Sequence, residues 1–115
     1  MMITLQQARA LLNQIDEDMI TIFELYQSDH SVELYQKLHD LRQARLEVIK
    51  DVALYKFKHK LPIYDPQRER ELIDRNCRLL KDQKNISSYL RFIEDILVES
   101  KQYQEKLITS LCHDE

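Results

Sequence analysis

Residues 27–31 read Gln-Ser-Asp-His-Ser, and this polar stretch decides how the N-terminal half of the chain folds. Apolar side chains recur at helical spacing over residues 5–26 and again over residues 34–55. The second stripe is out of phase with the first by about one position, and Ser31 is a good cap for a helix beginning at Val32. The pattern favours two helices joined as a hairpin, with one continuous helix through residues 27–31 as the alternative.

Composition extends the helical interpretation to the whole chain. The 115 residues include no glycine and only two prolines, and 32% of them are charged. β-Hairpins rely on glycine in their turns, whereas long amphipathic helices need few turns and many charged residues. We therefore expect an all-α fold, in which a single domain spanning residues 1–115 forms a bundle of three to four long helices.

Two further capping sequences predict where the remaining helices begin. Asp65 is a good N-cap and Pro66 suits the first helical position, so a helix should run from there to about Lys81. Another cap at residues 85–87 should begin a last helix that ends near Leu111.

The sequence also argues against several kinds of partner. It has no run of the roughly 20 apolar residues that span a bilayer, and its N-terminus does not resemble a signal peptide. A net charge of −3 gives no general attraction to nucleic acid. Cys77, Cys112 and the four scattered histidines lack metal-ligand spacing, and we interpret both cysteines as reduced thiols. We expect a cytoplasmic protein without a metal, nucleic-acid or membrane partner.

Five polar residues interrupt the apolar stripes of the predicted helices: Arg9, Arg45, Lys56, Ser100 and Gln104. Arg45 and Lys56 are eleven positions apart, which puts them on the same helix face. Each cation alone could extend from the edge of a core into water. Several together inside a bundle require an anion to neutralise them, so the set predicts an anion-binding pocket between helices.

The order of these residues resembles the all-helical class of chorismate mutases. In that family, a lysine ends a long first helix and a D-x-x-R-E motif opens the second. The resemblance consists of Arg9-x5-Ile15-Asp16, Arg45 eleven residues before Lys56, Lys56-x5-Pro62-x2-Asp65-x2-Arg68-Glu69, and Ser100-x3-Gln104. These motifs follow the family's order and cover nearly the whole chain.

The resemblance implies the rearrangement of chorismate to prephenate, on the route to phenylalanine and tyrosine, with no cofactor. The expected partner is therefore a small molecule, the chorismate dianion. By resemblance, Arg9 and Arg45 would bind its two carboxylates, where bidentate guanidinium geometry is suitable. Lys56 would bridge a carboxylate and the ether oxygen of the breaking bond, and Gln104 would donate to the same oxygen. These four are the expected catalytic residues.

The remaining motif residues are expected to complete the binding site. By resemblance, Glu69 and the main chain near Asp65 would bind the ring hydroxyl, while Arg68 and Ser100 would line the polar wall. Asp16, although part of the resemblance, is interpreted as a residue of an exposed polar helix face.

Two other functions remain open at this point. An isochorismate pyruvate lyase would share the fold and the cationic pocket, although the intact Asp65-x2-Arg68-Glu69 run favours the mutase. A non-catalytic helical module that binds a partner or regulates an enzyme is the other alternative. Such a module has no need for a set of pocket cations.

The spacing of the two arginines bears on the oligomeric state. Arg9 and Arg45 are further apart than the family usually has them; in the usual dimer the first arginine enters the partner's site. A hairpin turning at residues 28–31 would instead place Arg9 beside Lys50 of the same chain. A continuous helix that crosses its twin is the domain-swapped equivalent. We therefore expect either a monomer with an intrachain hairpin or a swapped homodimer.

Overall fold

The computed structural model describes residues 3–113 and is built from four long helices. They are α1 (Leu5–Ser28), α2 (Val32–Lys58), α3 (Pro66–Leu79) and α4 (Ile86–His113), with a short 3-10 turn at Gln83–Asn85 before α4. No strand occurs within this described range, so the all-α prediction is confirmed. Every one of these helices is too short or too polar to cross a membrane.

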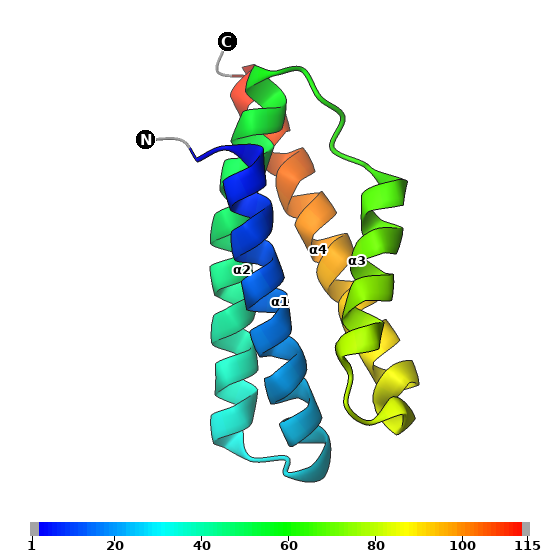
Figure 1. Ribbon diagram of the computed structural model, residues 1–115. Helices are drawn as coiled ribbons and strands as arrows, with labels where there is room; N and C mark the ends of the chain where they lie inside the picture. Colours follow the sequence, from blue (N-terminus) through cyan, green and yellow to red (C-terminus); the bar gives the residue numbers. More distant parts are fainter. Residues whose placement is uncertain (1–2, 114–115) are drawn as a thin grey trace.

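The polar stretch at residues 27–31 is a turn between two antiparallel helices (Figure 1). Asp29, the cap that ends α1, has extended backbone angles. Ser31 begins α2 as predicted, because its hydroxyl accepts a hydrogen bond from the main-chain nitrogen of Leu34 at 3.2 Å. The hairpin prediction is confirmed. Its register is slightly shifted from the predicted one, so that Asp16 lies opposite Arg45.

Two apolar clusters fill the interior of the bundle. The larger cluster, toward the hairpin turn, consists of Met19, Ile20, Phe23, Leu38, Leu72, Leu80, Tyr89, Ile93 and Ile96. The smaller cluster, toward the other end, consists of Ala8, Leu12, Ile49 and Val52. Buried polar residues come between the two clusters along the helices: Asp16 on α1, Arg45 on α2 and Ser100 on α4. The bundle is therefore crossed by a polar layer.

The connection from α2 to α3 lies at the end of the bundle opposite the hairpin turn (Figure 1). Lys60, two residues after the end of α2, has a left-handed conformation with φ of 56°. The main-chain nitrogens of Lys60 and Leu61 donate back to the carbonyls of Phe57 and Lys56, at 3.3 and 2.8 Å. This is a Schellman motif, which usually employs glycine at the left-handed position, but this chain has none.

The two later helices begin where their capping residues predict. The Asp65 carboxylate accepts a hydrogen bond from the main-chain nitrogen of Arg68 at 3.1 Å, and Pro66 occupies the first helical turn. α3 then ends at Leu79, slightly before the predicted Lys81. α4 continues to His113, slightly beyond the predicted Leu111.

Candidate active site

One pocket opens between the four helices and the α2–α3 connection, and it gathers every predicted site residue. Its polar lining consists of Arg9, Arg45, Lys56, Asp65, Arg68, Glu69, Ser100, Lys101 and Gln104. Its apolar lining consists of Leu5, Leu12, Ile49, Val52, Ile63, Leu72 and Leu97. Residues that are far apart in the sequence thus contribute to a single cavity, which is what the interrupted helix stripes predicted.

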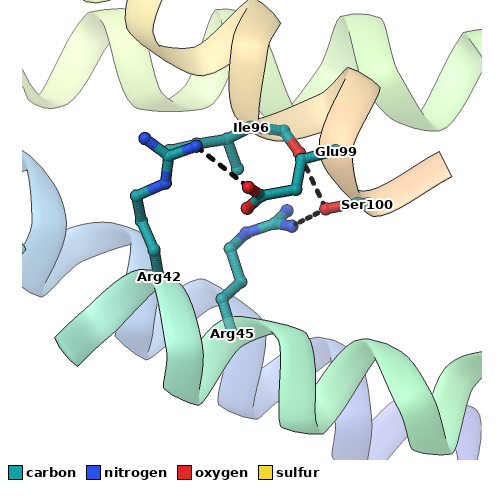
Figure 2. Close-up of polar contacts among 5 residues, drawn as sticks. All are labelled: Arg42, Arg45, Ile96, Glu99 and Ser100. Carbon is teal, nitrogen blue, oxygen red and sulfur yellow. Dashed lines mark hydrogen bonds and ion pairs between the residues drawn. The ribbon is translucent and has the colours of Figure 1, made fainter. Parts of the chain in front are cut away.

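Arg45 lies at the inner end of this pocket and is fixed by two neighbouring helices. Only 2% of its surface is exposed. Its Nε donates to Oδ1 of Asp16 on α1 at 3.0 Å, and its Nη1 donates to Oγ of Ser100 on α4 at 2.6 Å. Figure 2 shows the contact between Arg45 and Ser100. It also shows that the Ser100 hydroxyl donates a hydrogen bond to the Ile96 carbonyl, at 2.8 Å. The guanidinium therefore has one orientation in the pocket.

Asp16 corrects the sequence interpretation, which treated it as part of an exposed face. It is 1% exposed and forms a buried ion pair with Arg45. Burial raises the pKa of the Asp16 carboxyl, while the nearby Arg45 charge and its hydrogen bond act in the opposite direction. A signal was available in the sequence, because Asp16 lies four positions after Leu12 and three before Met19, on the buried face of α1.

Lys56 enters the pocket from the last turns of α2. Its Nζ donates a hydrogen bond to the main-chain carbonyl of Ile63 at 2.9 Å. Burial lowers the pKa of the Lys56 ammonium, and the positive charge of Arg9 lowers it further. The carboxylates of Asp65 and Glu69 oppose this shift. One cation and two carboxylates, from α1, α3 and the α2–α3 connection, thus influence one amino group.

The N-terminal end of α3 and its cap supply three polar residues to the wall of the pocket. Asp65 is exposed and caps the helix, whereas Arg68 and Glu69 are half-buried where they line the pocket. Burial lowers the pKa of Arg68, as does the charge of Arg9. The positive charge of Arg9 therefore acts on both Lys56 and Arg68.

Ser100 and Gln104 lie one helical turn apart on α4 and are both buried. Ser100 is occupied by Arg45 and by the Ile96 carbonyl. The side-chain oxygen of Gln104 is buried without a hydrogen-bond partner among the described residues. Because a buried acceptor without a partner is costly, this oxygen is suited to accept a hydrogen bond from a polar group in the pocket, while the amide nitrogen of Gln104 is the group that can donate.

The lining has a strong excess of positive charge. Five cationic side chains face two carboxylates, which gives a net charge of +3 if all are ionised. Within residues 3–113, His, Cys, Asp and Glu side chains nowhere gather in threes as they do around a metal ion. The arrangement can neutralise a small anion with more than one negative charge, and can direct several hydrogen-bond donors at it.

Comparison with known sequences gives this pocket a family. The chain matches the model of the family described as chorismate mutase type II over residues 31–105, well over half its length. The chain belongs to the chorismate mutase type II family. No curated protein and no solved structure gives a significant match to it.

The match to chorismate mutase type II covers α2, α3 and most of α4, but not α1. It therefore includes every pocket residue from Arg45 to Gln104 and excludes Arg9 and Asp16. In this member of the chorismate mutase type II family, α1 folds back along α2 and brings both residues to the site from the same chain.

Two contributors to the chorismate mutase type II pocket were missed by sequence reasoning. Lys101 lines it, with its Nζ 4.0 Å from the centre of the Tyr64 ring. Ile63 contributes its main-chain carbonyl to Lys56. Lys101 follows Ser100 directly and could have been suspected, whereas a carbonyl in a loop has no sequence signature.

Proposed function

We propose that this protein is a chorismate mutase that converts chorismate to prephenate. The observation that carries the proposal is the convergence of Arg9, Arg45, Lys56 and Gln104 in one positively charged pocket. Membership of the chorismate mutase type II family supports the same reaction. The proposal includes the setting of the reaction, which is cytoplasmic synthesis of phenylalanine and tyrosine.

The reaction rearranges bonds within one molecule, so the protein has to supply shape and charge. A flexible dianion must be bound in a chair-like conformer, and the negative charge that develops on its ether oxygen must be stabilised. A millionfold acceleration corresponds to about 8 kcal/mol. A conformational clamp and two donors that strengthen in the transition state can supply an amount of that order.

In the proposed complex, two arginines bind the carboxylates of chorismate. Arg45 is buried, fixed by Asp16 and Ser100, and can offer its remaining N–H groups. Arg9 is partly exposed on α1 and forms no ion pair with the carboxylates of residues 3–113, so its charge is available to a ligand. Together they determine the orientation of the dianion.

Lys56 and Gln104 act on the ether oxygen in this proposal. The Lys56 ammonium has three donors and uses one of them on Ile63, so others can reach a carboxylate and the ether oxygen. Gln104 approaches from α4 as a neutral donor. Preorganised donors of this kind cost no rearrangement at the moment of reaction.

The other polar lining residues bind the rest of the substrate. We assign the ring hydroxyl to Glu69 and to the main chain near Asp65. Arg68 completes the cationic wall, and Ser100 acts through its hydrogen bond to Arg45. No cofactor has a role in this scheme.

The test is the loss of chorismate absorbance with purified protein, with prephenate identified as the product. Lys56→Ala should lower kcat/KM by at least about 1000-fold, because a transition-state donor and a charge are lost together. Its circular dichroism spectrum should remain native, since Lys56 is only partly buried. Near-normal turnover by folded Lys56→Ala would contradict the proposal.

Failure of the wild-type assay would separate the two alternatives. Release of pyruvate from isochorismate, without conversion of chorismate, would identify a lyase. A folded protein inactive on both substrates would support the non-catalytic helical module.

A further inference from the structure

Asp16 is the one buried charged residue at the pocket that the proposed reaction leaves without a role. It lies behind Arg45, does not line the cavity, and belongs to the helix that the family match does not cover. The charged and polar groups that influence the ionisation of Asp16, or share its environment, come from each of the other helices. They are Arg45 on α2, Arg68, Arg75 and Asn76 on α3, and Tyr89 on α4.

A purely structural explanation of this ion pair is weak. Taking both charges out of water costs more than an apolar pair of the same size would, unless every polar atom is satisfied. Here Oδ2 of Asp16 and both side-chain polar atoms of Asn76 are buried without a hydrogen bond of good geometry among the described residues, although Asn76 lies close enough to Asp16 to lower the pKa of its carboxyl. The arrangement is therefore costly to the fold, which directs attention to what it does for Arg45.

The geometry shows how Asp16 can direct Arg45. The Nε–H group is fixed by Asp16, and the Nη1 group is fixed by Ser100 from another helix. With two different atoms of one planar group attached to two helices, rotation of the guanidinium is prevented. Nη2 has no protein acceptor within residues 3–113 and belongs to a residue that lines the pocket, so it remains for a ligand.

The charge of Asp16 has a second consequence. Without it, the lining carries a net charge of +3, which exceeds that of a dianion. The ionised Asp16 carboxylate behind Arg45 reduces this to +2, which matches the two carboxylates of chorismate.

We infer that Asp16 is a positioning residue, which together with Ser100 fixes the Arg45 guanidinium in the orientation that receives a substrate carboxylate. The substrate side of this inference rests on the proposed function. Because a neutral carboxyl accepts a weaker hydrogen bond than a carboxylate, the positioning depends on the ionised form. Asp16→Asn then resembles the protonated state of the wild-type protein at every pH.

The kinetic experiment compares wild type, Asp16→Asn and Asp18→Asn. Asp18 is the matched control, because it is an exposed aspartate on the same helix, and its side chain accepts a hydrogen bond from Gln14 on that helix. Asp16→Asn should lower kcat/KM about 10- to 100-fold at neutral pH while Asp18→Asn does not. The kcat/KM of the wild type should fall on acidification, and that of Asp16→Asn should not show this acidic limb. A variant that merely contained less folded protein would keep the limb.

A spectroscopic readout tests the positioning without turnover. The Nε–H signal of Arg45 in nitrogen–proton correlation NMR should be protected from exchange in the wild type and in Asp18→Asn. Acidification of the wild type should reduce that protection, and Asp16→Asn should lack it throughout. If wild type binds chorismate without converting it, the proposed function fails, and the same variants are compared by their Kd for chorismate.

Each outcome decides the inference. A folded Asp16→Asn protein with kcat/KM within about twofold of wild type would overturn it. So would an acidic limb that persists in the variant, or an Arg45 signal that stays protected. If Asp16→Asn does not fold, Asp16→Glu replaces it, because glutamate keeps the charge but displaces the carboxylate. A kcat/KM equal to that of wild type in Asp16→Glu would overturn the inference, and a reduced kcat/KM would support it.

Discussion

The Lys56 ammonium donates a hydrogen bond to the main-chain carbonyl of Ile63, 2.9 Å away in the α2–α3 connection. The connection thereby determines the position of the Lys56 ammonium group. It is itself fixed at α2 by the turn at Lys60 and at α3 by the Asp65 cap. The position of one reactive-site cation thus depends on the conformation of a short loop.

The ionisation of Lys56 should be visible in the pH dependence of the reaction. Burial and the charge of Arg9 lower its pKa below the ordinary 10.5, so the ammonium loses its proton at a lower pH than an exposed lysine. We expect kcat/KM to fall on the alkaline side with an apparent pKa below 10.5, because kcat/KM reports groups of the free enzyme. In Lys56→Arg, whose guanidinium does not titrate, any remaining activity should lack this limb. A limb that persists unchanged in Lys56→Arg would assign it to another group.

The left-handed residue at the end of α2 gives a prediction about stability. Lys60 has φ of 56°, a conformation that costs a residue with a Cβ roughly 1–2 kcal/mol. Glycine adopts it freely but loses more entropy on folding, so Lys60→Gly should stabilise the protein by about 0.5–1 kcal/mol. Chemical denaturation measures this difference. Lys58→Gly, inside the last turn of α2, is the control and should destabilise the protein by about 1 kcal/mol. A less stable Lys60→Gly variant would contradict the prediction.

A mixing experiment distinguishes the intrachain hairpin from the swapped dimer. Arg9→Ala and Lys56→Ala should each be nearly inactive, because each removes a pocket cation. If α1 completes the site of its own chain, the two variants refolded together should remain inactive. In a swapped dimer, a mixed pair contains one intact site, and about a quarter of wild-type activity should return. Size-exclusion chromatography with light scattering gives the mass in parallel.

The raised pKa of Asp16 predicts how stability changes with pH. Because the folded-state pKa lies above the ordinary value of 3.8, the folded protein binds more protons than the unfolded chain between the two values. The contribution of Asp16 to stability is therefore lost as pH rises through that window. Relative to Asp16→Asn, which lacks the group, wild type should lose free energy of unfolding as pH rises above 3.8. Denaturation of both proteins across this range measures it, and a constant difference would contradict the shift.

Much of the architecture could be predicted because local signals were strong and agreed with one another. Ser31 and Asp65 cap helices where their side chains predicted it, and the phase slip near residues 27–31 marks a true turn. The pocket could be predicted because cations rarely interrupt an apolar stripe without a reason. In each case the information lay within a few turns of one helix.

The remainder depends on contacts between helices that no local pattern contains. Asp16 was misplaced although its spacing put it on the buried face of α1, and its ion-pair partner Arg45, which lies on another helix, has no local signature. The Ile63 carbonyl could not be predicted, because any residue at that position carries the same group. Lys101 could have been suspected from its position beside Ser100, but its contact with the Tyr64 ring of the α2–α3 connection has no signature in its own helix.

The polar layer that crosses the bundle has a consequence for how the molecule opens. The apolar cluster on the hairpin side of it has nine buried residues, and the cluster on the other side has four. Local stability follows the apolar contacts that an opening must break, so the helix ends around the smaller cluster should open at a lower cost than the rest. Amide hydrogens there should exchange with solvent first. Local opening of that end would give a small molecule access to the buried Arg45 guanidinium while the hairpin side stays closed.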